Sequence, residues 1–160
     1  MIIPSPAHLL THAASPWLAV FLWAMLGWTA FIDARSGRVP DRLLIAGAAG
    51  AALAMAILMP PSFLLARLVA AVICGGIIWA LNELWYYFRK RDALGMGDAK
   101  WSMLAAFGFG AAPVLWAWVA AAWLGLGLIG VMRLIGRPLK RVHFAPFLLV
   151  GLAIAKLWLS

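Results

Sequence analysis

Long apolar runs, separated by short segments that carry most of the charge, restrict the fold of this chain more than any other feature. A transmembrane helix needs about 20 consecutive, mostly apolar residues, and several of the runs approach or exceed that length. Of all residues, 66% are hydrophobic and 11% are charged, whereas about 25% are charged in an ordinary soluble domain. Such a chain has too little polar surface to cover a soluble globule. We therefore predict an all-α integral membrane protein with a single domain over residues 1–160.

Six apolar segments are expected to form helices. Their predicted ranges are 17–33, 41–59, 62–88, 98–110, 113–134 and 144–158. The fourth is short, because at about 1.5 Å per residue it extends over about 20 Å, against a hydrocarbon core of about 30 Å. Local thinning of the bilayer, or protein packing around the end of this helix, would accommodate it.

The basic residues predict how these helices are oriented. Of the 13 lysines and arginines, all except Arg67 and Lys156 lie in or beside three loops, which follow the first, third and fifth predicted helices. Loops rich in basic residues stay on the cytoplasmic side of a membrane. Two loops on the same side need an even number of crossings between them, so the short fourth segment is expected to cross. The prediction is a bundle of six transmembrane helices with both termini extracytoplasmic.

The expected partners are the lipid bilayer and a substrate, not a nucleic acid. The formal net charge is +8, but the basic residues form short clusters with no nucleic-acid motif around them. A single cysteine, Cys74, excludes an intrachain disulfide and a cysteine-rich zinc site. His8, His12 and His143 form no helical ligand pair with a nearby carboxylate. No metal and no other cofactor is expected.

Two of the five acidic residues are candidates for catalysis. Carboxylates in or beside membrane helices are costly, so each is a functional candidate. The predicted topology places Asp33 at the cytoplasmic end of the first helix and Asp98 at the cytoplasmic start of the fourth, where they could meet across the bundle. Two adjacent carboxyls cannot both ionise. The charged one can take a proton from water while the protonated one polarises a peptide carbonyl. Gly95 and Gly97 would let a substrate strand approach closely.

Structural roles are open to the same two acids. Asp98 could be the N-cap of the fourth helix, since aspartate is common at that position. Asp33 could be a helix-end residue that reaches the membrane interface. From the residues alone, a catalytic pair and two structural acids are about equally well supported.

The other acids point to structural roles. Asp41 is expected to cap the second helix, and Asp92 to be a solvated loop charge. Asn82 and Glu83 lie inside the third predicted helix, where unpaired polar groups are costly. They either support an active site or hold helices together, and we favour the second role. Lys100 is expected mainly to set the orientation of the chain and to contact anionic lipid.

Four segments resemble motifs of the type IV prepilin peptidase family. Gly95-Met96-Gly97-Asp98-Ala99-Lys100 is similar to its GxGDxK motif, and Asp33 followed by Val39-Pro40-Asp41 is similar to its first motif. Asn82 resembles a polar position in the third helix of the family, and Phe144-Ala145-Pro146-Phe147-Leu148 resembles its Phe-Gly-Pro-Phe segment. The resemblance extends over about residues 17–160.

The resemblance implies an aspartic endopeptidase of the bacterial inner membrane, with Asp33 and Asp98 as the catalytic residues. Its substrates would be prepilins or pseudopilins, cut after a glycine at the end of a short basic leader, at the cytoplasmic face. The supporting motif residues would be Gly95, Gly97, Lys100, Pro40, Asn82 and Pro146.

The sequence departs from the family pattern in two residues and in one domain. Trp101 stands where the family usually has leucine, and Ala145 where it has glycine, and both could alter substrate fit. Larger members carry an N-terminal cytoplasmic part with paired cysteines that methylates the new N-terminus, and no segment here corresponds to it. We therefore expect the compact, peptidase-only form, similar to those of tight-adherence (Flp) pilus systems.

Two other functions stay open. A catalytically silent relative would bind or scaffold pilus components. A small proton- or ion-coupled transporter would use the buried acids as ion sites, but it is expected to contain internal repeats with matching broken helices, and the sequence has no convincing repeat. The identity of the prepilin and the oligomeric state also stay open.

Overall fold

The computed structural model describes residues 16–90, 95–137 and 143–159, and all regular secondary structure in these ranges is helical. The helices are α2 (Pro16–Ser36), α3 (Asp41–Leu58), α4 (Pro61–Arg89), α5 (Met96–Phe109), α6 (Ala111–Leu134) and α7 (Ala145–Leu159). Each of these six helices overlaps one predicted segment, which confirms the all-α fold class. His8, His12 and Asp92 lie outside the described residues.

Proline and glycine define two of the connections between helices. Pro60 has extended backbone and is the N-cap of α4, and Pro61 begins that helix. Gly110, with a φ of 92°, is the single residue between α5 and α6, and this backbone conformation favours glycine. In the first helix, α2 continues past its predicted end to Ser36, so Asp33 lies inside the last turn.

The surface of the bundle suits lipid rather than water. Four helices, α2, α3, α4 and α6, are long and apolar enough to cross a membrane, and α7 is a shorter apolar helix. Large apolar side chains are exposed along these helices, Trp17, Trp123 and Leu157 among them. Contiguous exposed apolar surface of this extent is unfavourable in water. The chain is therefore a multi-pass membrane protein.

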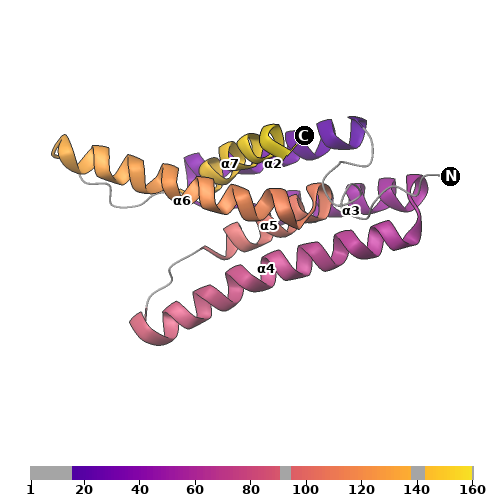
Figure 1. The fold of residues 1–160 in the computed structure, drawn as a ribbon, viewed down its shortest axis with the longest axis horizontal. Coiled ribbons are helices and arrows are strands. Elements are labelled where there is room, and N and C mark those ends of the chain that lie inside the picture. The colour runs from indigo at the N-terminus through magenta and orange to yellow at the C-terminus, as the bar shows by residue number, and fades with distance from the viewer. Residues whose placement is uncertain (1–15, 91–94, 138–142, 160) are drawn as a thin grey trace.

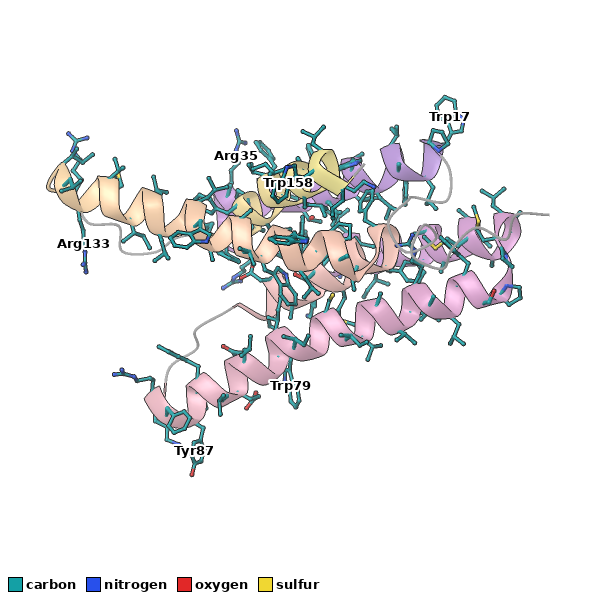
Figure 2. All side chains as sticks on the ribbon, in the orientation of Figure 1. Trp17, Arg35, Trp79, Tyr87, Arg133 and Trp158 are labelled. Atoms are coloured by element: carbon teal, nitrogen blue, oxygen red, sulfur yellow. The ribbon has the colours of Figure 1, made fainter. Side chains whose placement is uncertain are left out.

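Basic residues gather at one end of the molecule. Arg35, Arg89 and Arg133 lie in the last turns of α2, α4 and α6. Helices α4 and α6 project farthest at this end (Figure 1), where Tyr87 and Arg133 mark their tips, whereas Trp17 lies at the opposite end (Figure 2). The positive-inside rule associates such a pattern with a cytoplasmic face.

The short helix α5 forms the centre of the bundle (Figure 1). It has 14 residues, of which ten are buried. It contacts each of the other five described helices. Protein therefore surrounds the helix that is least able to span lipid alone, and this packing fixes the position of its first turn, where Asp98 lies.

Candidate active site

Asp33 and Asp98 line the same cavity. Asp33 lies in the last turn of α2 and Asp98 in the first turn of α5, and their exposed fractions are 7% and 8%. The cavity has a volume of about 340 Å³, and we call it the acid cavity. It is lined by Asp33, Gly37, Arg38, Val39, Asp41, Gly95, Met96, Gly97, Asp98 and Lys100. Two acids that are 65 positions apart in the sequence thus line one cavity, between the end of α2 and the start of α5.

The environment of Asp98 favours a retained proton. Asp98 lies in the first turn of α5, before the apolar part of that helix that follows Lys100, and its carboxyl is largely buried. This burial, reinforced by the charge of Asp33, raises the pKa of Asp98 to about 6, while a hydrogen bond with the Gly95 backbone opposes the rise. Desolvation and a like charge both disfavour the ionised form of a carboxyl. The raised pKa makes Asp98 suited to keep a proton.

Gly95 and Gly97 lie at the start of α5, just before Asp98. Gly95 is the N-cap, with extended backbone, and its carbonyl accepts a hydrogen bond of 2.9 Å from the Asp98 N–H. Asp98 is therefore the third residue of the helix, and the suggestion that it is the N-cap is wrong. From this position its carboxyl reaches back to the Gly95 backbone, as the acidic residue of a capping box does. A local capping bond thus fixes the direction of the acid.

Gly97 lets this turn pack against the segment that follows Asp33. A Cβ at Gly97 would lie 2.8 Å from Cγ2 and 3.0 Å from Cβ of Val39. No ordinary side chain fits at that separation, so glycine is required if α5 and the 37–40 segment are to touch. The two motif segments are therefore in direct contact.

An ion pair joins the same two segments. Lys100 Nζ lies 2.8 Å from Oδ1 of Asp41, and the two side chains are 42% and 58% exposed. Such an exposed pair contributes about 1 kcal/mol or less to stability. The predicted role of Asp41 needs correction, because Pro40 is the N-cap of α3 and Asp41 is its first residue. The pairing of Lys100 with Asp41 was not predicted, and its contact with lipid stays a prediction.

In the described residues, no group of three or more His, Cys, Asp or Glu side chains could hold a metal ion. The arrangement is a pair of carboxyls between two packed motif segments, which suits acid–base chemistry on a bound peptide.

The family model described as the type IV leader peptidase family matches residues 19–132, more than half of the chain. This range contains both acids and both segments around them. The chain belongs to the type IV leader peptidase family. Searches of curated proteins and of solved structures give no significant match. The matched range ends before Pro146, so the likeness of the Phe144–Leu148 segment to the family stays a prediction.

In this member of the leader peptidase family, Trp101 connects α5 to α2. Its side chain is fully buried, and its Nε1–H donates a hydrogen bond of 3.2 Å to the carbonyl of Leu26. The Thr29 hydroxyl donates to the same carbonyl at 2.9 Å. Trp101 does not line the acid cavity, and its effect on substrate fit stays a prediction. A buried indole needs a partner for its N–H, and this is the signal that could have found its role from the sequence.

Replacing Trp101 with phenylalanine tests this link. The ring is largely kept while the N–H donor is lost, so we expect the free energy of unfolding to fall by about 1 kcal/mol. Thermal unfolding in detergent would measure the change, and leader cleavage should decrease with it. Trp123→Phe is the matched control, because Trp123 is exposed on α6. Equal effects of the two substitutions would contradict the assignment.

Several predicted site residues lie elsewhere. Asn82 is half-buried and Glu83 is exposed, both on α4, and neither lines the acid cavity. Pro146 lies in the first turn of α7, also outside the cavity lining, and Ala145 beside it is fully buried. Pro40 acts through the backbone, since it is the N-cap of α3 between two residues that line the cavity. The first motif and the GxGD motif thus line the acid cavity together, whereas Asn82 and Pro146 are not among its lining residues.

Proposed function

We propose that this chain is an aspartic endopeptidase of the bacterial cytoplasmic membrane that removes the basic leader from prepilins or pseudopilins. The observation that supports this most is the acid cavity, in which two largely buried acids from different helices lie between the motif segments of a leader peptidase family. Cleavage would follow a glycine at the end of the leader, at the cytoplasmic face.

In the proposed reaction the two acids have different protonation states. Asp98, whose pKa is raised to about 6, holds the proton and donates a hydrogen bond to the oxygen of the scissile carbonyl. Ionised Asp33 takes a proton from a water molecule, whose oxygen attacks the carbonyl carbon. Asp33 then gives the proton that it took from water to the leaving amine as the tetrahedral intermediate collapses, and the leader and the mature chain separate. Both carboxyls are thereby back in their starting protonation states.

The proposed topology places this chemistry at the membrane edge. Six crossings, with both termini extracytoplasmic, put the basic ends of α2, α4 and α6 in the cytoplasm. In α5 the apolar part after Lys100 would complete the crossing inside the protein bundle, and the turn with Asp98 would lie at the cytoplasmic rim. Water and the leader can then reach the acids from the cytoplasm, while the apolar part of the substrate stays in the membrane.

The pH dependence of cleavage tests the protonation states. The pKa of Asp98 is raised, so this acid is protonated below about pH 6 and loses its proton as the pH rises further. We expect kcat/KM to fall by about tenfold per pH unit on the alkaline side of the dyad titration, since the form with one proton disappears. Circular dichroism over the same pH range controls for unfolding. A constant kcat/KM between pH 5 and pH 8 would contradict this assignment, because that range extends from about one unit below to about two units above the raised pKa of Asp98.

Cleavage by purified components tests the proposed function itself. The protein, reconstituted in vesicles, is incubated with a purified prepilin, and the products are identified by mass. We expect one cut after the glycine of the leader. A prepilin that binds tightly but stays intact would support a scaffold. Proton or ion uptake that depends on the acids, with no peptide product, would support a transporter.

A further inference from the structure

A second cavity lies along one side of α5. Its volume is about 630 Å³, and we call it the apolar groove. It is lined by residues of three helices, namely Asp41, Leu44, Ile45, Ala48, Ala49 and Ala52 of α3, Leu68 and Ala71 of α4, and Lys100, Met103, Leu104 and Phe107 of α5. All of them except Asp41 and Lys100 are apolar. The groove is therefore suited to an apolar occupant with a polar group at one end.

The apolar groove is continuous with the acid cavity. Asp41 and Lys100 line both cavities, and the 2.8 Å ion pair between them lies on the border. From this border the lining residues of α3 recur with helical spacing as far as Ala52, so they form one face of the helix. The face extends over roughly 17 Å at about 1.5 Å per residue. The groove thus leads from the acids along α3, away from the basic end of the molecule.

The groove is open to the membrane and can admit a helix. Ile45 and Leu68, on the two outer helices, are 68% and 46% exposed. Three alanines of α3 and one of α4 line it, and small residues allow the backbone of a second helix to approach closely. Met103 contributes an adaptable side chain on α5. A helix could therefore enter sideways from the lipid without passing through the bundle.

We propose that the apolar groove holds the apolar segment that follows the scissile bond of the substrate, with this segment running in the same direction as α3. The proposal rests on the proposed function. A substrate whose basic leader stays in the cytoplasm and whose next segment enters the membrane must change from polar to apolar near the cut. Here the polar acid cavity changes to the apolar groove at the Asp41–Lys100 pair. A chain with its leader in the cytoplasm and its cut at the acids enters the membrane beside α3. A lipid tail would fit the apolar walls, but the continuity with the acids favours the substrate.

Filling the groove should weaken cleavage of the complete substrate. Ala49 and Ala46 are both exposed alanines of α3, but only Ala49 lines the groove. We expect Ala49→Phe to lower kcat/KM for the whole prepilin by about tenfold or more, mostly through KM, because the bulky ring occupies the binding surface. Ala46→Phe should stay within about twofold of wild type. Thermal unfolding of both variants checks that they are equally folded.

A short peptide separates this proposal from the proposed function. It carries the leader and the cleavage site but lacks the apolar segment, so its cleavage should be the same in wild type, Ala49→Phe and Ala46→Phe. If the wild type cleaves the prepilin and Ala49→Phe matches Ala46→Phe on it, the groove is not the binding surface, although the peptidase function stands. If the wild type cleaves nothing, the function itself fails.

Crosslinking identifies the occupant. A photoreactive side chain of similar size replaces Leu68, which lines the groove, or Val69, which is exposed on the same helix outside the lining. The protein used is the Asp98→Asn variant, which is expected to bind substrate without cutting it. Position 68 should crosslink to the apolar segment of the prepilin, and position 69 to lipid. A lipid adduct alone at position 68, in the presence of bound prepilin, would overturn the proposal in favour of a lipid site.

Discussion

Replacement of either Asp33 or Asp98 by asparagine is expected to reduce the rate of leader cleavage by a factor of about 10³. Asparagine has nearly the shape of aspartate, but it cannot accept the proton of the attacking water or hold the proton that polarises the carbonyl. Both side chains are less than 10% exposed, with fractions of 7% and 8%, so the neutral amide should be tolerated at least as well as a buried charge. Cleavage rates of purified variants measure the loss.

Glu83→Gln is the matched control for the acid variants. Glu83 is an exposed acid on α4 that lies outside the lining of the acid cavity. Its amide variant should keep the wild-type cleavage rate within about twofold. Thermal unfolding shows whether each protein is folded. A folded Asp33→Asn or Asp98→Asn protein that still cleaves at the wild-type rate would show that the residue in question is not catalytic.

The second large effect is expected from Gly97→Ala. The added Cβ would lie 2.8 Å from Val39 Cγ2, so the first turn of α5 must move away from the segment that follows α2. Asp98 is the next residue and moves with that turn. A displacement of about 1 Å at a catalytic group can reduce the rate by about 100-fold, and we expect a loss of that order. The cleavage assay measures it, with thermal unfolding as the check on stability.

Two comparisons make this prediction specific. A Cβ at Gly76 of α4 meets no atom within 4 Å, so Gly76→Ala should leave cleavage unchanged. Val39→Ala removes the nearest clashing atom, Cγ2, but leaves the Val39 Cβ at 3.0 Å, so it should partly restore cleavage in the Gly97→Ala protein. Equal activity of the two alanine variants, or no rescue by Val39→Ala, would mean that this contact does not position Asp98.

The features that depend on local sequence could be predicted. Apolar runs, bounded by signals such as Pro60 and Pro61, placed each helix of the described residues within a few residues of its observed bounds. The short length of α5 was also visible, because Asp98 and Gly110 limit its apolar run. Its central position was not predicted, since periodicity shows neither which helices surround a given helix nor how far it is buried.

The contacts between the motif segments could not be predicted from spacing. The Lys100–Asp41 pair joins residues 59 positions apart, and the Trp101–Leu26 bond joins residues 75 positions apart. Each depends on the rotation of one helix relative to another, which small differences in packing decide. The resemblance singled out Gly97, but the reason for a glycine became clear only with Val39 opposite it.

The most direct test of the pair is the single-turnover cleavage rate of four proteins: wild type, Asp33→Asn, Asp98→Asn and the double variant. Residues that act as one catalytic unit show strongly non-additive losses. We predict that the double variant is no slower than the slower single variant, because the loss of either acid already disables the dyad. A double variant whose loss equals the product of the two single losses would show that the acids act independently, and would contradict the proposed mechanism.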